Sequence, residues 1–123
     1  MPADLKPVSL RVDREAILRY ADITGDYNPI HVDAEFAAKT ALGSVIAHGT
    51  LSMNLIWQSL AATFGPGALR GAAIDIRFAK PVRAGDLVEA CGRAADDAAG
   101  RFEVWVRNQH GENVIDGSAT LGR

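Results

Sequence analysis

Two residues in the first third of the chain have side chains suited to acid–base chemistry on a water molecule. Asp26 and His31 lie close together in the segment TGDYNPIH, which spans residues 24–31. Gly25 and the Asn28-Pro29 pair predict a tight, rigid turn that brings both side chains to one point. A carboxylate and an imidazole that converge on one water can move its proton near neutral pH. The segment therefore predicts a catalytic pair of Asp26 and His31.

The same residues also have ordinary structural interpretations. An Asp beside a Gly commonly hydrogen-bonds its own backbone in a turn, and His31 equally suits a surface or helix-start position. Residue chemistry alone leaves these interpretations open. Asn28 is expected to fix the loop rather than to react, because Asn strongly prefers turns. Gly25 and Pro29 are assigned the same loop-shaping role.

A second feature is the tetrapeptide Ala47-His48-Gly49-Thr50, which directly precedes a long apolar segment. A glycine at a helix start leaves backbone N–H groups exposed and lets a ligand approach the chain. Together with the helix dipole, these N–H groups can stabilise negative charge that develops on a carbonyl oxygen during water addition. Gly49 is therefore a candidate oxyanion site; the alternative is that it only permits close packing.

The pattern of apolar residues predicts the elements that must position these groups. Alternation predicts five strands, near residues 8–12, 74–78, 87–93, 102–107 and 114–121. Asp13 and Asp33 are expected to cap two short helices. A longer helix is predicted from about Thr50 to Phe64, and its nearly all-round apolar surface predicts burial. The pattern favours an α+β fold, with a helix packed on an antiparallel sheet.

Composition excludes several classes of function. The 123 residues carry a net charge of −2, so there is no basic field for nucleic acid. The apolar region 45–64 is interrupted by polar residues and predicts no membrane span. The first ten residues lack the pattern of a signal peptide, which favours a cytoplasmic protein. The single cysteine, Cys91, excludes an internal disulfide and is expected to be a small core residue rather than a nucleophile.

The Asp26 segment resembles the signature of the MaoC-like, R-specific enoyl-CoA hydratase family. That signature is filled without a gap by Tyr20, Ile23, Thr24, Gly25, Asp26, Asn28, Pro29, Ile30, His31 and Ala37. His48-Gly49, the segment RFAKPV at 77–82 and Gly85-Asp86 are also similar to this family. The resemblance thus covers nearly the whole chain.

This resemblance implies one hotdog domain over residues 1–123, in which a sheet of about five strands wraps round the long helix. It implies R-specific hydration of trans-2-enoyl thioesters, or the reverse dehydration, with no cofactor and with a homodimer or higher oligomer. Coenzyme A is the favoured carrier, and acyl-carrier protein is the other. Asp26 would be the base on water, His31 would orient it, and the Gly49 N–H would hold the thioester oxygen. Which group protonates the α-carbon stays open.

Several residues near this constellation are assigned more loosely. His48 and Trp57 are placed in the substrate pocket. Trp57 is either core or a plug of the acyl tunnel that restricts the enzyme to short chains. Short to medium acyl chains are the expected substrates. Arg70, Arg77, Lys80 and Arg83 either contact the phosphates of coenzyme A or form a solvated face. His31, Asp33 and His48 match no strong metal-binding spacing, so no metal is expected.

Two other functions fit the same scaffold. One is a hotdog thioesterase, which directs water at the thioester carbon instead of the β-carbon. The other is a non-catalytic subunit that binds acyl thioesters. The intact pair of Asp26 and His31 in its frame favours the hydratase over both.

Overall fold

The computed structural model of the chain describes residues 4–96 and 99–122. The strands are β1 (Val8–Val12), β2 (Ala73–Phe78), β3 (Asp86–Ala94), β4 (Arg101–Arg107) and β5 (Asn113–Thr120). The helices are α1 (Arg14–Thr24), α2 (Pro29–Val32), α3 (Ala34–Ala38), α4 (Gly49–Phe64) and the short 3-10 helix η1 (Pro66–Leu69). Residues 1–3, at the start of the segment that lacks a signal-peptide pattern, lie outside the described residues.

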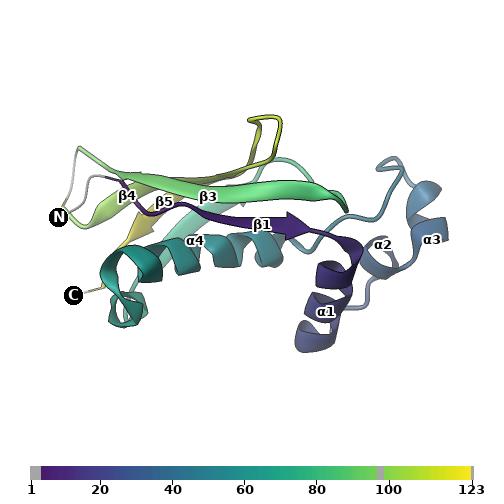
Figure 1. The fold of residues 1–123 in the computed structure, drawn as a ribbon, viewed down its shortest axis with the longest axis horizontal. Helices are drawn as coiled ribbons and strands as arrows, with labels where there is room; N and C mark the ends of the chain where they lie inside the picture. The colour runs from purple at the N-terminus through teal and green to yellow at the C-terminus, as the bar shows by residue number, and fades with distance from the viewer. Residues whose placement is uncertain (1–3, 97–98, 123) are drawn as a thin grey trace.

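The five strands form one sheet in the order β1-β3-β4-β5-β2, and every neighbouring pair is antiparallel. Helix α4 runs along one face of this sheet, while α1, α2 and α3 gather beyond one of its ends (Figure 1). The predicted α+β hotdog arrangement is therefore confirmed. The N-terminus of α4 lies at the same end of the sheet as the three short helices, and the candidate chemistry gathers there.

The inner face of the sheet holds α4 in place. Alternate residues of β3 and β4 are buried and pack in one core cluster with Leu55, Ile56 and Leu60 of α4. Complete burial of one such aliphatic side chain contributes about 1.5–3 kcal/mol. The helix is thereby fixed along its length, and its first residue, Gly49, is fixed with it.

Helix α4 is less enclosed than its apolar composition predicts. Its fully buried residues, Ser52, Leu55, Ile56, Ser59 and Leu60, occupy the side that meets the sheet. Residues on its other sides are either half-buried, such as Trp57, or exposed, such as Gln58 and Ala62. A sheet covers one side of a helix, so an all-round apolar helix keeps partly exposed flanks unless something else packs there.

The prediction that Cys91 lies in the core is wrong. The alternation of β3 turns Ala90 and Gly92 inward, which puts Cys91 on the outer face of the sheet, partly exposed. Its Sγ lies 3.4 Å from Oε1 of Glu89. Desolvation and the Glu89 carboxylate both raise the pKa of the Cys91 thiol, which disfavours the reactive thiolate.

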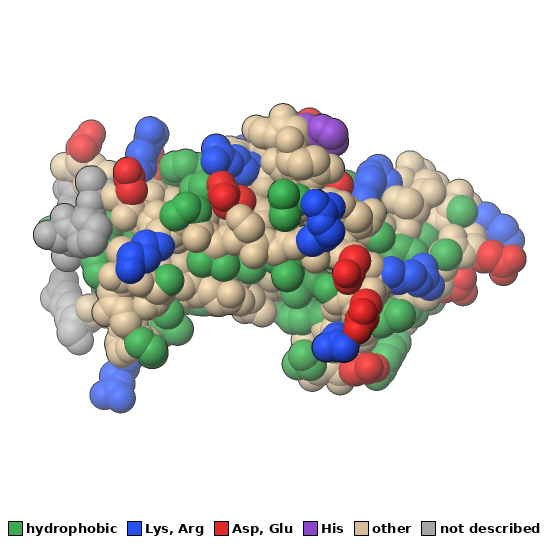
Figure 2. Space-filling view, viewed as in Figure 1, with side chains coloured by type: hydrophobic (Ala, Val, Ile, Leu, Met, Phe, Trp, Pro, Cys, Tyr) green, Lys and Arg blue, Asp and Glu red, His purple; other side chains and the backbone are tan. Residues whose placement is uncertain are grey.

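The surface mixes both signs of charge. Figure 2 shows acidic and basic side chains interspersed over one face of the molecule, with apolar side chains scattered between them. Among the described residues, no helix combines the length and apolar character required to cross a membrane.

Candidate active site

A cavity of about 450 Å³ opens where the N-terminus of α4 meets the loop after α1 and the segment after β2. Its wall brings together residues that are far apart in the sequence. The most informative lining residues are Asp26, His31, His48, Gly49, Ser52 and Phe78. The structure therefore brings Asp26, His31 and Gly49, the three residues assigned to chemistry, to one cavity.

The loop that carries Asp26 is held by local hydrogen bonds. Gly25 ends α1 in the left-handed conformation, with φ at 71°, a geometry that glycine adopts without a steric penalty. Asp26 then accepts a hydrogen bond at Oδ1 from the backbone N–H of Asn28, over 3.2 Å. Among the described residues, its other carboxylate oxygen has no such partner. Asp26 thus has one oxygen engaged in the turn and one available for chemistry.

Asn28 and Pro29 begin a helix that the sequence did not predict. Asn28 accepts a hydrogen bond at Oδ1 from the N–H of Ile30, over 3.2 Å, and so caps the four-residue helix α2. Pro29 occupies the first turn, where its missing N–H costs nothing and its fixed φ suits a helix. The predicted rigid turn is therefore also a helix start, and it aims His31 at the cavity.

The imidazole of His31 is oriented by one backbone carbonyl. Its Nδ1 lies 2.8 Å from the carbonyl oxygen of Ile46. Because a carbonyl only accepts, Nδ1 carries the hydrogen and Nε2 of the neutral ring keeps its lone pair. Half-buried at the cavity wall, His31 is thus positioned to accept a proton at Nε2.

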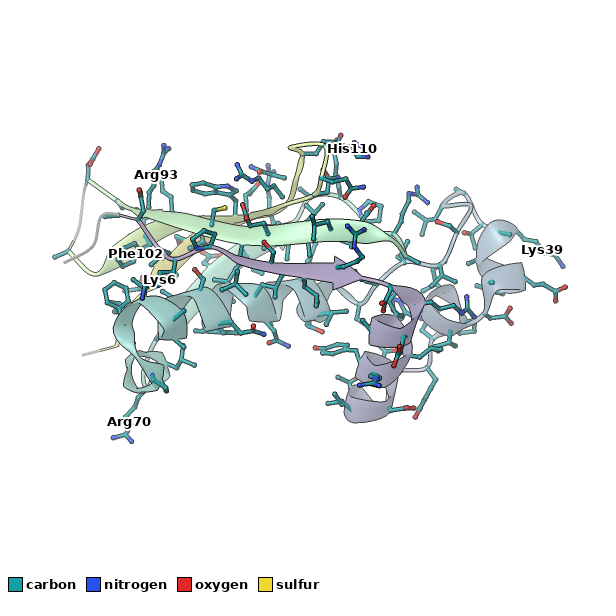
Figure 3. The ribbon with its side chains drawn as sticks, in the orientation of Figure 1. Lys6, Lys39, Arg70, Arg93, Phe102 and His110 are labelled. Atoms are coloured by element: carbon teal, nitrogen blue, oxygen red, sulfur yellow. The ribbon has the colours of Figure 1, made fainter. Side chains whose placement is uncertain are left out.

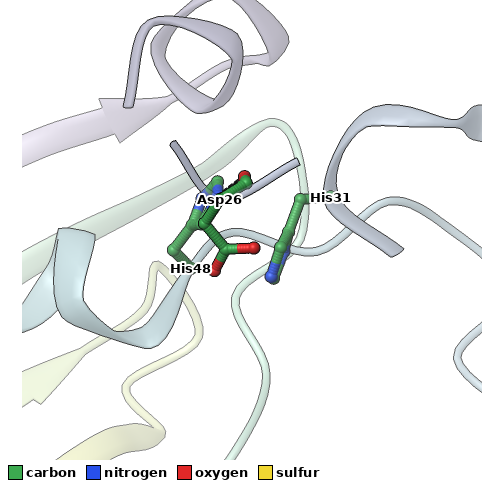
Figure 4. Close-up of side chains that lie close together, drawn as sticks. All are labelled: Asp26, His31 and His48. Atoms are coloured by element: carbon green, nitrogen blue, oxygen red, sulfur yellow. Dashed lines mark hydrogen bonds between the residues drawn. The ribbon is translucent and has the colours of Figure 1, made fainter. Parts of the chain in front are cut away.

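His48 ties this loop to α4. Its side chain is 3% exposed, and its Nε2 donates to the backbone oxygen of Asp26 over 2.9 Å. Its ring stacks on His31 with centroids 3.9 Å apart and meets the ring of Tyr20 edge-on. Figure 4 shows the three side chains gathered together, with the Asp26 carboxylate pointing toward His31. His48 thus lines the cavity, and its hydrogen bond supports the loop that carries Asp26.

The side chains that could hold a metal ion in the structure are Asp26, His31 and His48, so Asp26 takes the place of Asp33 in the set considered from the sequence. One carboxylate oxygen and one ring nitrogen from each histidine lie within 4.8 Å of one another. The two imidazole planes are only 23° apart and stacked. Lone pairs in the planes of two stacked rings run side by side instead of converging on an ion, so this arrangement fits a metal poorly. The same spacing lets Asp26 and His31 share one water molecule.

Gly49 is the first residue of α4, and its backbone N–H lies in the unpaired first turn of the helix. The ring of Phe78 packs directly on it: a Cβ atom at Gly49 would lie 2.7 Å from Cε1 of Phe78. Phe78 still has 57% of its surface exposed. Gly49 is itself exposed, so the Phe78 ring lies beside it in the cavity lining without covering it. The sequence analysis did not predict the contact between Phe78 and Gly49, because it placed Phe78 only within the family-like segment 77–82.

Four basic residues were expected either to contact the phosphates of coenzyme A or to form a solvated face. They lie in different places in the structure. Lys80 lines the cavity and pairs with Glu112, which lowers the pKa of that carboxyl. Arg77 and Arg83 hydrogen-bond to neighbouring groups of the protein. Arg70 extends from the opposite end of α4, far from the short helices (Figure 3). Of the four, Lys80 is the one that lines the cavity.

Trp57 is placed differently from the other predicted pocket residues. Its side chain is half-buried and packs against the core cluster, but it does not line the cavity of the single chain. It lies two turns along α4 from Gly49. Trp57 could therefore contact an acyl chain only if the chain extended beyond the described cavity.

Known proteins are similar to this chain in sequence and in fold. Residues 3–114 match the MaoC like domain. The chain is 45% identical over 74 residues to a 3-hydroxybutyryl-CoA dehydratase of Methylorubrum extorquens, a match covering 59% of this chain and 46% of the relative. It is 32% identical to an (R)-specific enoyl-CoA hydratase of Rhodospirillum rubrum, across 89% of this chain and 78% of the relative.

A solved structure gives the same result for the fold. An R-hydratase of Pseudomonas aeruginosa superposes with a TM-score of 0.79 at 32% identity, covering 95% of this chain and 77% of that one. The match to the Methylorubrum dehydratase spans less than half of that relative's length.

Proposed function

Since the chain belongs to the MaoC-like domain family, we propose that it catalyses R-specific hydration of trans-2-enoyl thioesters, or the reverse dehydration. One observation carries the proposal. The free carboxylate oxygen of Asp26, the unprotonated Nε2 of His31 and the exposed N–H of Gly49 all belong to residues of one cavity wall. Those are the three groups that water addition across an activated double bond requires.

The reaction follows from these positions. Asp26 accepts a proton from water as the water oxygen bonds to the β-carbon, and His31 holds that water at Nε2. Electrons of the double bond shift toward the thioester oxygen, where the Gly49 N–H and the N-terminal dipole of α4 stabilise the charge. Protonation of the α-carbon by one member of the pair then completes the R-3-hydroxyacyl thioester.

The carrier and the assembly are also proposals. Relatives named for acyl-CoA substrates support coenzyme A as the carrier, and Lys80 at the cavity wall offers one cation for it. The edge strands β1 and β2 each leave one side unpaired within the sheet. Exposed edges are commonly covered by pairing subunits, so we propose a homodimer or higher homo-oligomer in the cytoplasm.

The direct test is loss of crotonyl-CoA hydration in Asp26→Asn and His31→Ala. Loss of an acid–base group costs about 100-fold or more in rate, so we expect each variant to fall at least that far. The loss of enoyl absorbance measures the rate, and chiral analysis of the product measures its configuration. His110→Ala is the matched control, since His110 lies in the exposed turn between β4 and β5 (Figure 3).

The same assay separates the two other functions. A thioesterase releases free thiol from the substrate, whereas a hydratase consumes the enoyl absorbance without releasing thiol. A non-catalytic subunit binds acyl-CoA and does neither. Retention of most hydration by both Asp26→Asn and His31→Ala would contradict the proposed roles.

A further inference from the structure

Ser52 has a hydroxyl whose role the mechanism above does not explain. Its residue lines the cavity, its side chain is 1% exposed, and its Oγ has no hydrogen-bond partner. Nearly all buried polar groups in native proteins are hydrogen-bonded, so each exception requires an explanation. A hydroxyl kept unpaired in the wall of a substrate cavity points to a partner that arrives with the substrate.

Other hydroxyls on the helices of this chain are satisfied within the protein. Thr24 and Thr63 each donate to the carbonyl one turn earlier, over 2.8 and 2.7 Å. Ser59, on the same helix as Ser52, donates to the backbone oxygen of Lys6 over 2.6 Å. A helical serine ordinarily has this local option. Ser52 does not use it, so its hydroxyl hydrogen remains available.

We propose that Ser52 is a catalytic residue that donates a hydrogen bond to the thioester oxygen, as a second donor beside the Gly49 N–H. The inference rests on the proposed function. Ser52 follows Gly49 by three residues on α4, and residues at that spacing share a helix face. Side chains on a helix lean toward its N-terminus, so the Ser52 hydroxyl leans over the turn that begins with Gly49.

Two donors suit the chemistry better than one. As the water oxygen bonds to the β-carbon, the double-bond electrons move to the thioester oxygen and Asp26 takes the water proton. The charge returns to the α-carbon when that carbon is protonated, so the oxygen is negative only between the two steps. A donor fixed by a buried helix stabilises this charge without reorganisation.

A structural role for Ser52 is the competing explanation. The Nδ1 atom of His48, one turn earlier on the chain, is also buried and unpaired. If the Ser52 hydroxyl served that nitrogen, it would support the loop that holds Asp26. The two roles predict opposite effects on stability. Removing an unpaired buried hydroxyl relieves a desolvation penalty and does not lower stability. Removing a hydroxyl that makes a structural hydrogen bond leaves its buried partner unpaired and lowers stability.

The experiment combines rate and thermal stability in Ser52→Ala. We expect its melting temperature to equal or exceed that of the wild type, while kcat for crotonyl-CoA falls about 100-fold with little change in KM. Ser52→Cys fills the same space but donates weakly, so it should also be slow. Ser59→Ala, which removes a bonded hydroxyl from the same helix, should melt lower and keep its kcat.

A spectroscopic measurement isolates the contact itself. Binding of 2,4-hexadienoyl-CoA to Asp26→Asn should shift the dienoyl absorbance to longer wavelength, because donors at the thioester oxygen polarise the conjugated system. Adding Ser52→Ala should reduce that shift. An unchanged shift, a kcat within threefold of the wild type, or a joint loss of stability and rate would overturn the assignment. Absence of crotonyl-CoA hydration in the wild type would instead reject the proposed function.

Discussion

At the scale of single residues, Asp26 and His31 each use one polar atom to hold the site in place, and the proposed chemistry uses another atom of the same side chain. Asp26 gives one oxygen to the N–H of Asn28 and keeps the other. His31 gives Nδ1 to the carbonyl of Ile46 and keeps Nε2. The structural and catalytic interpretations of these residues are therefore compatible, because the bond made by one atom fixes the direction of the other.

Gly49 provides the sharpest test at this scale. In Gly49→Ala, the new methyl group would collide with the ring of Phe78, whose nearest atom would be 2.7 Å away. Since Phe78 is 57% exposed, the ring can swing aside, and the chain should fold with a small loss of stability. The methyl and the displaced ring would crowd the N–H that is proposed to bind the thioester oxygen. We therefore expect kcat for crotonyl-CoA to fall about 100-fold.

Gly67→Ala is the control for this change. Gly67 lies in η1, and a Cβ atom there would meet nothing within 4 Å. It should keep the rate and the melting temperature of the wild type. A Gly49→Ala variant as fast as the wild type would show that the N–H of Gly49 does not contact the reacting oxygen.

The sequence predicted the residues with distinctive chemistry better than their neighbours. Asp26, His31 and Gly49 were expected together, and the structure gathers them in one cavity. Ser52 and Phe78 were not singled out. The sequence around a serine in an apolar helix does not indicate whether its hydroxyl will have a hydrogen-bond partner. The contact between Phe78 and Gly49 depends on how β2 ends beside α4, which local patterns do not encode.

At the scale of elements, the short helix α2 aligns Asp26 and His31, the proposed catalytic pair. Its cap, Asn28, follows Asp26 closely and fixes the turn that leads to His31. The sequence signal Asn-Pro was interpreted as a turn alone, because a four-residue helix has no room for a repeating apolar pattern. The longer elements were predicted from periodicity, which identifies an element better than it identifies the face that will be buried. Cys91, on the outer face of β3, illustrates this limit.

Substitutions of two helix caps can distinguish a loss of stability from a loss of alignment between Asp26 and His31. Asn28→Ala and Asp33→Ala each remove a side-chain cap, from α2 and α3 respectively, and each should cost about 1 kcal/mol in unfolding free energy. Only Asn28→Ala loosens the turn between Asp26 and His31, so its kcat should fall about tenfold or more, as expected for misplaced catalytic groups. Urea unfolding and crotonyl-CoA assays measure the two effects. Equal rates in both variants would contradict an aligning role for α2.

At the scale of the whole molecule, α4 joins the site to a surface that the chain leaves partly exposed. Its inner side is buried against the sheet, while its flanks remain half-buried. The apolar pattern predicted burial all round the helix, but a sequence does not state whether its own chain or a second copy supplies the cover. The half-buried flanks are compatible with the proposed homo-oligomer.

Trp57 belongs to this scale, because its indole lies half-buried on α4 beyond the cavity wall of the single chain. If it limits the length of the acyl chain, Trp57→Ala should open space past the cavity and raise kcat/KM for eight-carbon relative to four-carbon enoyl-CoA, by roughly tenfold or more, since a few methylenes in an apolar pocket contribute that much. Its unfolding free energy should fall by about 2 kcal/mol, less than for a fully buried aromatic.

Trp105→Ala supplies the matched comparison, because Trp105 is also half-buried but lies on β4, on the sheet face opposite α4. It should lose some stability and leave the ratio of kcat/KM between the two chain lengths unchanged. If Trp57→Ala also leaves that ratio unchanged, Trp57 only packs against the core, and the limit on chain length must come from the walls around Ile115 and Val82, which do line the cavity. A substrate panel from four to ten carbons, run on both variants, distinguishes these outcomes.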